Sequence, residues 1–160
     1  MKKFLFIGTF VLIACSINAQ DYYTSLGIRG GMSTGFTLKH YVSEIDAVEG
    51  IVAFRWGGFI ITGLYEYVYR FDVPGLSWYY GFGAHIGYWD GGRAENPDWW
   101  EVEHEGGLTV MGADGIIGLE YTFENTPINI SVDWKPVFNL IGYSGMWGDM
   151  AAISIRYVIN

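Results

Sequence analysis

Cysteine is nearly absent from the chain, since Cys15 is the only one among 160 residues. A disulfide framework within one copy is therefore excluded. Basic side chains are also few, with nine Lys and Arg against 17 Asp and Glu. Nucleic acid is not an expected partner, because neutralising its phosphates requires clustered cations.

Long hydrophobic runs are missing after residue 20, although hydrophobic residues make up 51 % of the chain. No later segment has the roughly 20 consecutive apolar residues that a membrane-spanning helix needs. Glycine and aromatic residues are abundant instead, with 23 glycines and 18 % aromatics. A hydrophobic chain without hydrophobic runs is typical of β-strands in which apolar and polar positions alternate.

The first 20 residues have a different pattern from the rest. Lys2 and Lys3 precede an apolar run that ends at Ala14, and Ile17-Asn18-Ala19 follows. This pattern predicts a cleaved secretory signal peptide over residues 1–19 and a single domain over 20–160. Without Lys2 and Lys3 the formal charge is 7 − 17 = −10. The stretch ending at Cys15 also matches a lipoprotein cleavage box, so lipidation of Cys15 stays open as an alternative.

Alternation is clearest in residues 77–89, SWYYGFGAHIGYW. Its even positions are apolar or aromatic, whereas four of its odd positions are glycine or histidine between Gly81 and Gly87. The same period of two recurs along the chain and predicts eight strands. Their ranges are 24–30, 35–42, 47–56, 59–71, 77–89, 107–123, 128–142 and 150–160.

The connections between these strands fall into two classes. Residues 43–46, 72–75 and 124–127 are short and turn-like, and they belong to one end. The longest connection, 90–106, belongs to the other end. An even strand count with this arrangement predicts an all-β fold, an eight-stranded antiparallel transmembrane β-barrel with up-and-down order. The short turns are then periplasmic and residues 90–106 extracellular.

Charged side chains share the strand face opposite the apolar one, which in such a barrel is the inner face. Side chains of both signs are expected to pair there, because charges confined in a lumen require partners. We expect a network that fills the lumen, and a narrow pore gated by that network remains the alternative. The predicted network consists of Arg29, Lys39, Glu49, Arg55, Glu66, His85, Asp114, Glu120, Asp133, Lys135 and Arg156.

Seven stretches carry a resemblance to a known group: GIRGG (27–31), GFTLKHY (35–41), AVEGIVAFR (47–55), WYYGFGAHIG (78–87), GADGIIGLEYTF (112–123), INISVDWKP (128–136) and ISIRYVIN (153–160). The chain resembles the small eight-stranded OmpX, OmpA-transmembrane and opacity-protein-like barrels, in the style of Bacteroidetes-type bacteria. The resemblance implies Sec-type export to the bacterial outer membrane, contact with its lipids and lipopolysaccharide, and a monomer. It also implies a structural or surface-interaction role through extracellular loops.

An enzymatic role is not expected. Some barrels of this size act on lipid A, and one deacylase type carries His and Ser two positions apart on a strand. The positions two away from His85 are Gly83 and Gly87, so that pair is absent. A loop site would have only Ser144, Asp149 and a distant His104 to draw on. We therefore expect no catalytic residue and no cofactor.

The longest connection is acidic, with six Asp and Glu between Asp90 and Glu105 against Arg93 alone. Because their spacing is unlike that of an EF-hand, no metal site is expected. Trp99 and Trp100 are candidate anchors for an extracellular ligand or a host surface, since exposed aromatics in loops often contribute to binding.

Overall fold

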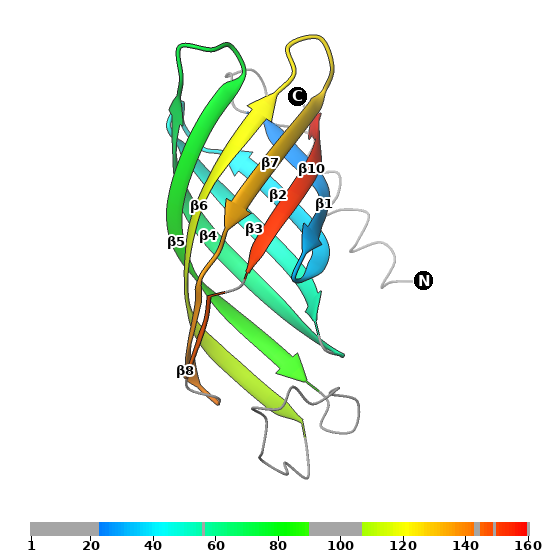
Figure 1. Ribbon diagram of the computed structural model, residues 1–160, viewed down its shortest axis with the longest axis vertical. Coiled ribbons are helices and arrows are strands. Elements are labelled where there is room, and N and C mark those ends of the chain that lie inside the picture. The colour runs from blue at the N-terminus through cyan, green and yellow to red at the C-terminus, as the bar shows by residue number, and fades with distance from the viewer. Residues whose placement is uncertain (1–22, 56, 90–106, 143–144, 149, 160) are drawn as a thin grey trace, which may run out of the picture.

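Ten strands make up the described part of the protein (Figure 1). The computed structural model describes residues 23–55, 57–89, 107–142, 145–148 and 150–159. The predicted signal peptide, Cys15, Trp99 and Trp100 lie outside these ranges. The strands are β1 (Thr24–Gly31), β2 (Thr34–Tyr41), β3 (Asp46–Arg55), β4 (Gly58–Arg70), β5 (Leu76–Trp89), β6 (Leu108–Thr122), β7 (Ile128–Trp134), β8 (Val137–Ile141), β9 (Gly145–Trp147) and β10 (Ala151–Ile159).

The strands close into one antiparallel barrel. From β1 to β7 each strand pairs with the next one along the chain, β7 pairs with β10, and β10 pairs with β1. β8 pairs with β6 beyond the end of β7, and β9 pairs with β8. The wall is therefore eight strands wide with meander order, which confirms the predicted all-β, eight-stranded antiparallel barrel. Among the described strands, the ring of eight has no open edge, whereas β9 beyond it pairs with β8 alone.

The seventh strand of the wall differs from its expected form. Residues 128–142 were predicted as one strand, but the ladder is interrupted at Lys135 and Pro136, between β7 and β8. Proline lacks the backbone N–H that a ladder hydrogen bond requires. The carbonyl of Pro136 still accepts a hydrogen bond of 3.0 Å from Gly115 N, so the wall continues past the interruption. Residues 145–147, predicted to be part of a loop, form β9.

The connections from β2 to β3, from β4 to β5 and from β6 to β7 lie together at one end of the barrel, which is also where β10 ends (Figure 1). We call it the turn end. In one turn Ser43 Oγ lies 2.6 Å from Asp46 Oδ2, and in another Gly75 adopts a φ of 81°. Gly75 is suited to that φ because a side chain there is strained. β5 ends and β6 begins at the opposite end, and the connection 90–106 lies outside the described residues.

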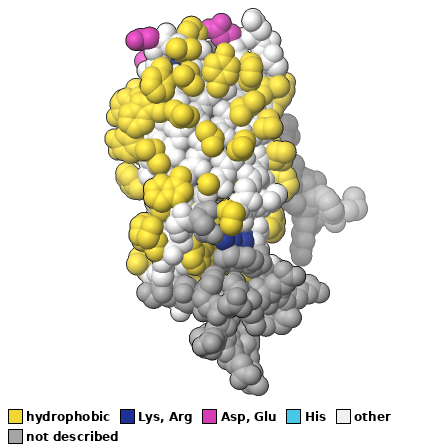
Figure 2. All heavy atoms as spheres, in the orientation of Figure 1, with side chains coloured by type: hydrophobic (Ala, Val, Ile, Leu, Met, Phe, Trp, Pro, Cys, Tyr) yellow, Lys and Arg dark blue, Asp and Glu magenta, His cyan; other side chains and the backbone are white. Residues whose placement is uncertain are grey.

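The outer surface of the wall is apolar. Figure 2 shows hydrophobic side chains over much of the described wall, with acidic side chains gathered at one end. Phe82 and Ile117 are 60 % and 50 % exposed, as the alternation predicted. Away from the strand ends, no outward position of the described strands carries a charged side chain. No helix among the described residues is long and apolar enough to cross a membrane.

Inward-facing glycines make room for large neighbours. A Cβ at Gly118 would lie 2.6 Å from the Tyr79 ring and 2.7 Å from Asp133 Cβ, and a Cβ at Gly112 would lie 2.7 Å from the His85 ring. An eight-stranded barrel is only just wide enough for its own side chains, so large inward side chains require small ones beside them. At the end opposite the turns, Trp89 and Trp147 pack edge to face within a buried apolar cluster.

Candidate functional site

Away from the strand ends, the charged side chains of the strands lie inside the barrel. Every residue of the predicted network lies inside and is at most 7 % exposed. The alternation of each strand accounts for this arrangement, because inward and outward positions follow one another with a period of two. The side chains form four groups around separate ion pairs.

Arg29 on β1 and Asp133 on β7 form the first group. The guanidinium donates two hydrogen bonds to the carboxylate, and the bond from Nη1 to Oδ2 measures 2.7 Å. Tyr79 on β5 also donates to Asp133 Oδ2, at 3.2 Å. All three side chains are buried, so the carboxylate is held by donors from two sides.

Glu49 on β3 and Arg156 on β10 form the second group. Arg156 Nη2 lies 2.5 Å from Glu49 Oε1, which also accepts a hydrogen bond from Thr37. The second terminal nitrogen of Arg156 donates to Asn129 Oδ1 at 3.1 Å and to Ser131 Oγ at 2.9 Å. Neutral partners on β7 thus satisfy donors that the carboxylate does not reach.

Lys39 on β2 lies between two carboxylates. Its Nζ is 2.9 Å from Glu120 Oε2 and 2.9 Å from Glu66 Oε2. The other oxygen of Glu120 accepts a hydrogen bond from the Tyr41 hydroxyl. The ammonium also lies 4.0 Å from the centre of the Tyr79 ring, within range of a cation–π contact.

The fourth group is built around Asp114 on β6. His85 Nδ1 lies 2.7 Å from Asp114 Oδ2, and Lys135 Nζ donates to Asp114 Oδ1 at 2.6 Å. The second ring nitrogen of His85 lies 3.0 Å from Asn139 Oδ1. Both ring nitrogens therefore face amide or carboxylate oxygens rather than a hydroxyl nucleophile.

Arg55 lies apart from these groups, at the end opposite the turns. Its Nη1 is 2.8 Å from the sulfur of Met150, and its carbonyl accepts a hydrogen bond of 3.0 Å from Trp89 Nε1. Trp89 and Met150 belong to the apolar cluster at that end. Arg55 thus borders the apolar cluster rather than the central ion pairs.

The sequence reasoning missed several polar partners of the network. Asn139 and Thr37 stand at inward positions, so the alternation of their strands carried the signal that they face the charges. Tyr41 also lies inside, and its hydroxyl contacts Glu120. Among the described residues, no three His, Cys, Asp or Glu side chains are grouped so that they could hold a metal ion. Trp99 and Trp100, the predicted surface anchors, fall outside the described ranges.

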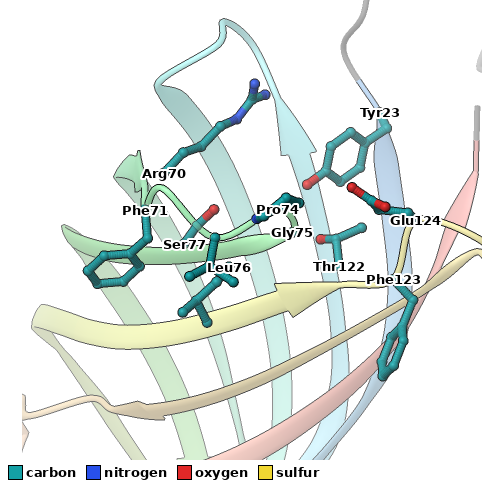
Figure 3. Close-up of a pocket in the computed structure, with 11 residues that line it drawn as sticks. Tyr23, Arg70, Phe71, Pro74, Gly75, Leu76, Ser77, Thr122, Phe123 and Glu124 are labelled. Atoms are coloured by element: carbon teal, nitrogen blue, oxygen red, sulfur yellow. The ribbon is translucent and has the colours of Figure 1, made fainter.

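A pocket of about 350 Å³ opens at the turn end (Figure 3). Tyr23, Pro74 and Glu124 gather around it, whereas the rings of Phe71 and Phe123 point away from it. One cation, Arg70, and one carboxylate, Glu124, belong to its lining. This lining is mixed in character, and we assign no ligand to it.

Comparison with known proteins gives a structural neighbour and no sequence relative. No protein-family model matches the chain, and no curated protein sequence matches it. The crystal structure of the N-terminal β-barrel domain of OprF from Pseudomonas aeruginosa has a similar fold, with a TM-score of 0.65 and 13 % sequence identity. The alignment covers 89 % of this chain and 100 % of that one. The chain therefore shares its barrel fold with the OprF domain.

Proposed function

We propose that this protein is an integral barrel of a bacterial outer membrane with a lumen filled by its own side chains. One observation carries the proposal: the wall is apolar outside and charged inside, the reverse of a water-soluble domain. A soluble monomer rarely exposes a continuous apolar patch larger than a few hundred Å². A closed barrel satisfies every backbone hydrogen bond within the sheet, which is what lipid requires.

The role that fits a filled lumen is structural or surface-interacting rather than catalytic. Arg29, Lys39, Lys135 and Arg156 each contact a carboxylate inside, and His85 faces Asp114 and Asn139. We assign the contact surface to the connection 90–106, on the side opposite the short turns, with Trp99 and Trp100 as its anchors. The partners that we propose for this surface are outer-membrane lipid, lipopolysaccharide or a host surface. We also propose that the protein is of the OmpX and opacity-protein type. We propose that it reaches the outer membrane by Sec-type export.

A narrow pore is the second candidate, favoured by one specific observation. The interior is lined by charged groups of both signs rather than by a purely apolar core, as a selective channel would be. Planar-bilayer recording of refolded protein separates the two roles. The filled barrel predicts no reproducible conductance steps, and reproducible steps would favour the pore.

Protease treatment of intact cells tests the orientation. Cleavage between Asp90 and Gly106 in intact cells is expected if this connection is extracellular. Cleavage confined to permeabilised cells would reverse the proposed orientation. Binding of lipopolysaccharide that is lost on replacing Trp99 and Trp100 by alanine, with the barrel still folded, would support the surface role.

A further inference from the structure

Glu66 is the surplus carboxylate of the central network. Four cations can each be matched to one carboxylate: Arg29 to Asp133, Arg156 to Glu49, Lys39 to Glu120 and Lys135 to Asp114. Among the described residues, the ion pair of Glu66 is a second contact to Lys39, which Glu120 already neutralises. Arg55 is too distant to compensate Glu66. Its strand partner Gly58 lies eight residues from Glu66 along β4, or roughly 26 Å of strand.

Glu66 lies beside a second carboxyl group. On the paired strands β3 and β4, Ala47 is opposite Glu66 and Glu49 is opposite Leu64, so the two glutamates are diagonal neighbours on the inner face. Both side chains are buried, at 1 % and 0 % exposed. Glu49 Oε2 and both carboxyl oxygens of Glu66 are buried without a hydrogen-bond partner among the described residues, although Glu66 Oε2 lies 2.9 Å from Lys39 Nζ. Two ionised carboxylates in this position repel each other, and each leaves an acceptor unsatisfied.

The described residues around this pair supply no positive charge beyond Lys39 and Arg156. Lys39 on β2 contacts Glu66, and Arg156 on β10 contacts Glu49. Glu120 on β6 and Tyr79 on β5 lie beside Lys39, and Arg29 on β1 is the remaining charged group of this part of the interior. Arg29 is paired with Asp133, Arg156 with Glu49 itself, and Lys39 is shared between Glu66 and Glu120. On β5, the residue opposite Glu66 is Gly81, which has no side chain to donate a hydrogen bond.

We propose that Glu49 and Glu66 share one proton, so that Glu66 is a neutral carboxylic acid donating a hydrogen bond to Glu49. The shared proton gives Glu49 Oε2 and Glu66 Oε1 the hydrogen-bond partner that each lacks, and it leaves four cations facing four carboxylates in the centre of the barrel. A metal ion fits the pair less well, because Lys39 Nζ is already 2.9 Å from Glu66 Oε2 and would repel it. The inference requires a folded barrel and is independent of what the loops contact.

Infrared spectroscopy of refolded protein in D₂O at neutral pH tests the shared proton, because a protonated carboxyl group has a carbonyl band separate from that of carboxylates. The wild type is expected to show this band, and Glu66→Gln is expected to lose it. The same substitution should leave the urea midpoint of unfolding unchanged, since the glutamine amide can donate to Glu49 in place of the proton. Asp133→Asn is the matched control, expected to keep the band and to lower the midpoint.

Several outcomes would overturn the shared proton. They are a folded wild type without the carboxyl band, a full band in Glu66→Gln, and a Glu66→Gln variant that fails to fold or loses as much stability as Asp133→Asn. A midpoint that rises with sodium or potassium in the wild type and not in Glu66→Gln would identify a metal cation instead. None of these results depends on membrane location or on binding by the loops. The shared proton can therefore fail while the proposed function holds, and the reverse is also possible.

Discussion

Arg29 and Asp133 form a bidentate ion pair across β10, the strand that separates β1 from β7 in the wall. The two residues are 104 positions apart in the sequence, and both are buried. Their contact links the first strand of the chain to the seventh strand of the wall, on the side where the barrel closes. It therefore adds a side-chain connection to the backbone ladders at the closure.

Removing one partner of this pair is expected to cost more than removing both. Asp133→Asn should lower the free energy of unfolding by about 3–5 kcal/mol, because it leaves the Arg29 guanidinium buried without its counter-charge. The double variant Arg29→Met with Asp133→Leu should recover much of that loss. Urea unfolding of refolded protein followed by tryptophan fluorescence measures both. A double variant less stable than Asp133→Asn would contradict the expectation.

A charge on the outer face should be costly in lipid. Phe82 lies near the middle of β5 and is 60 % exposed, so Phe82→Arg should destabilise the barrel in bilayers by about 2–4 kcal/mol. Phe82→Trp is the matched control, since it changes the side chain without adding a charge. Folding yield into lipid vesicles reports the difference. Equal yields for the two variants would argue that Phe82 does not meet the hydrocarbon.

The inward and outward glycines should respond oppositely to one added methyl group. Gly118→Ala would push a Cβ against Tyr79 and Asp133, and overpacking of this kind costs about 1–3 kcal/mol. At Gly63, by contrast, a Cβ would meet nothing within 4 Å. Gly63→Ala should be neutral or stabilising by up to about 1 kcal/mol, because it restricts the unfolded chain. Unfolding midpoints that fall equally in both variants would show that interior crowding is not the cause.

Alternation along the strands predicted both the barrel and the side of the wall on which each charge lies. It succeeds because a period of two assigns every side chain to one face, and a closed wall has only an inside and an outside. Phe82 and Glu120 lie on the faces expected of them, and each belongs to a strand with regular alternation.

The pairing inside the barrel was not predictable in the same way. Whether Arg29 reaches Asp133 or Glu49 depends on the stagger of the strands, and a single sequence does not specify that stagger. The Lys135-Pro136 interruption and strand β9 were missed because alternation continues through the proline and is not visible in a three-residue segment. Asn139 was missed for a simpler reason, since only charged residues were assigned to the network.

Isoleucine methyl groups provide the most direct test of the central claim, that lipid covers the outside of this barrel and side chains fill the inside. Ile28, Ile117 and Ile155 are at least half exposed on the outer wall, whereas Ile51 and Ile60 are 1 % exposed inside it. NMR spectra of methyl-labelled protein in lipid nanodiscs would be recorded with and without a spin-labelled acyl chain. The account predicts strong broadening of the three outer methyl signals and little at Ile51 and Ile60. Equal broadening of both sets, or none at Ile28, Ile117 and Ile155, would contradict it.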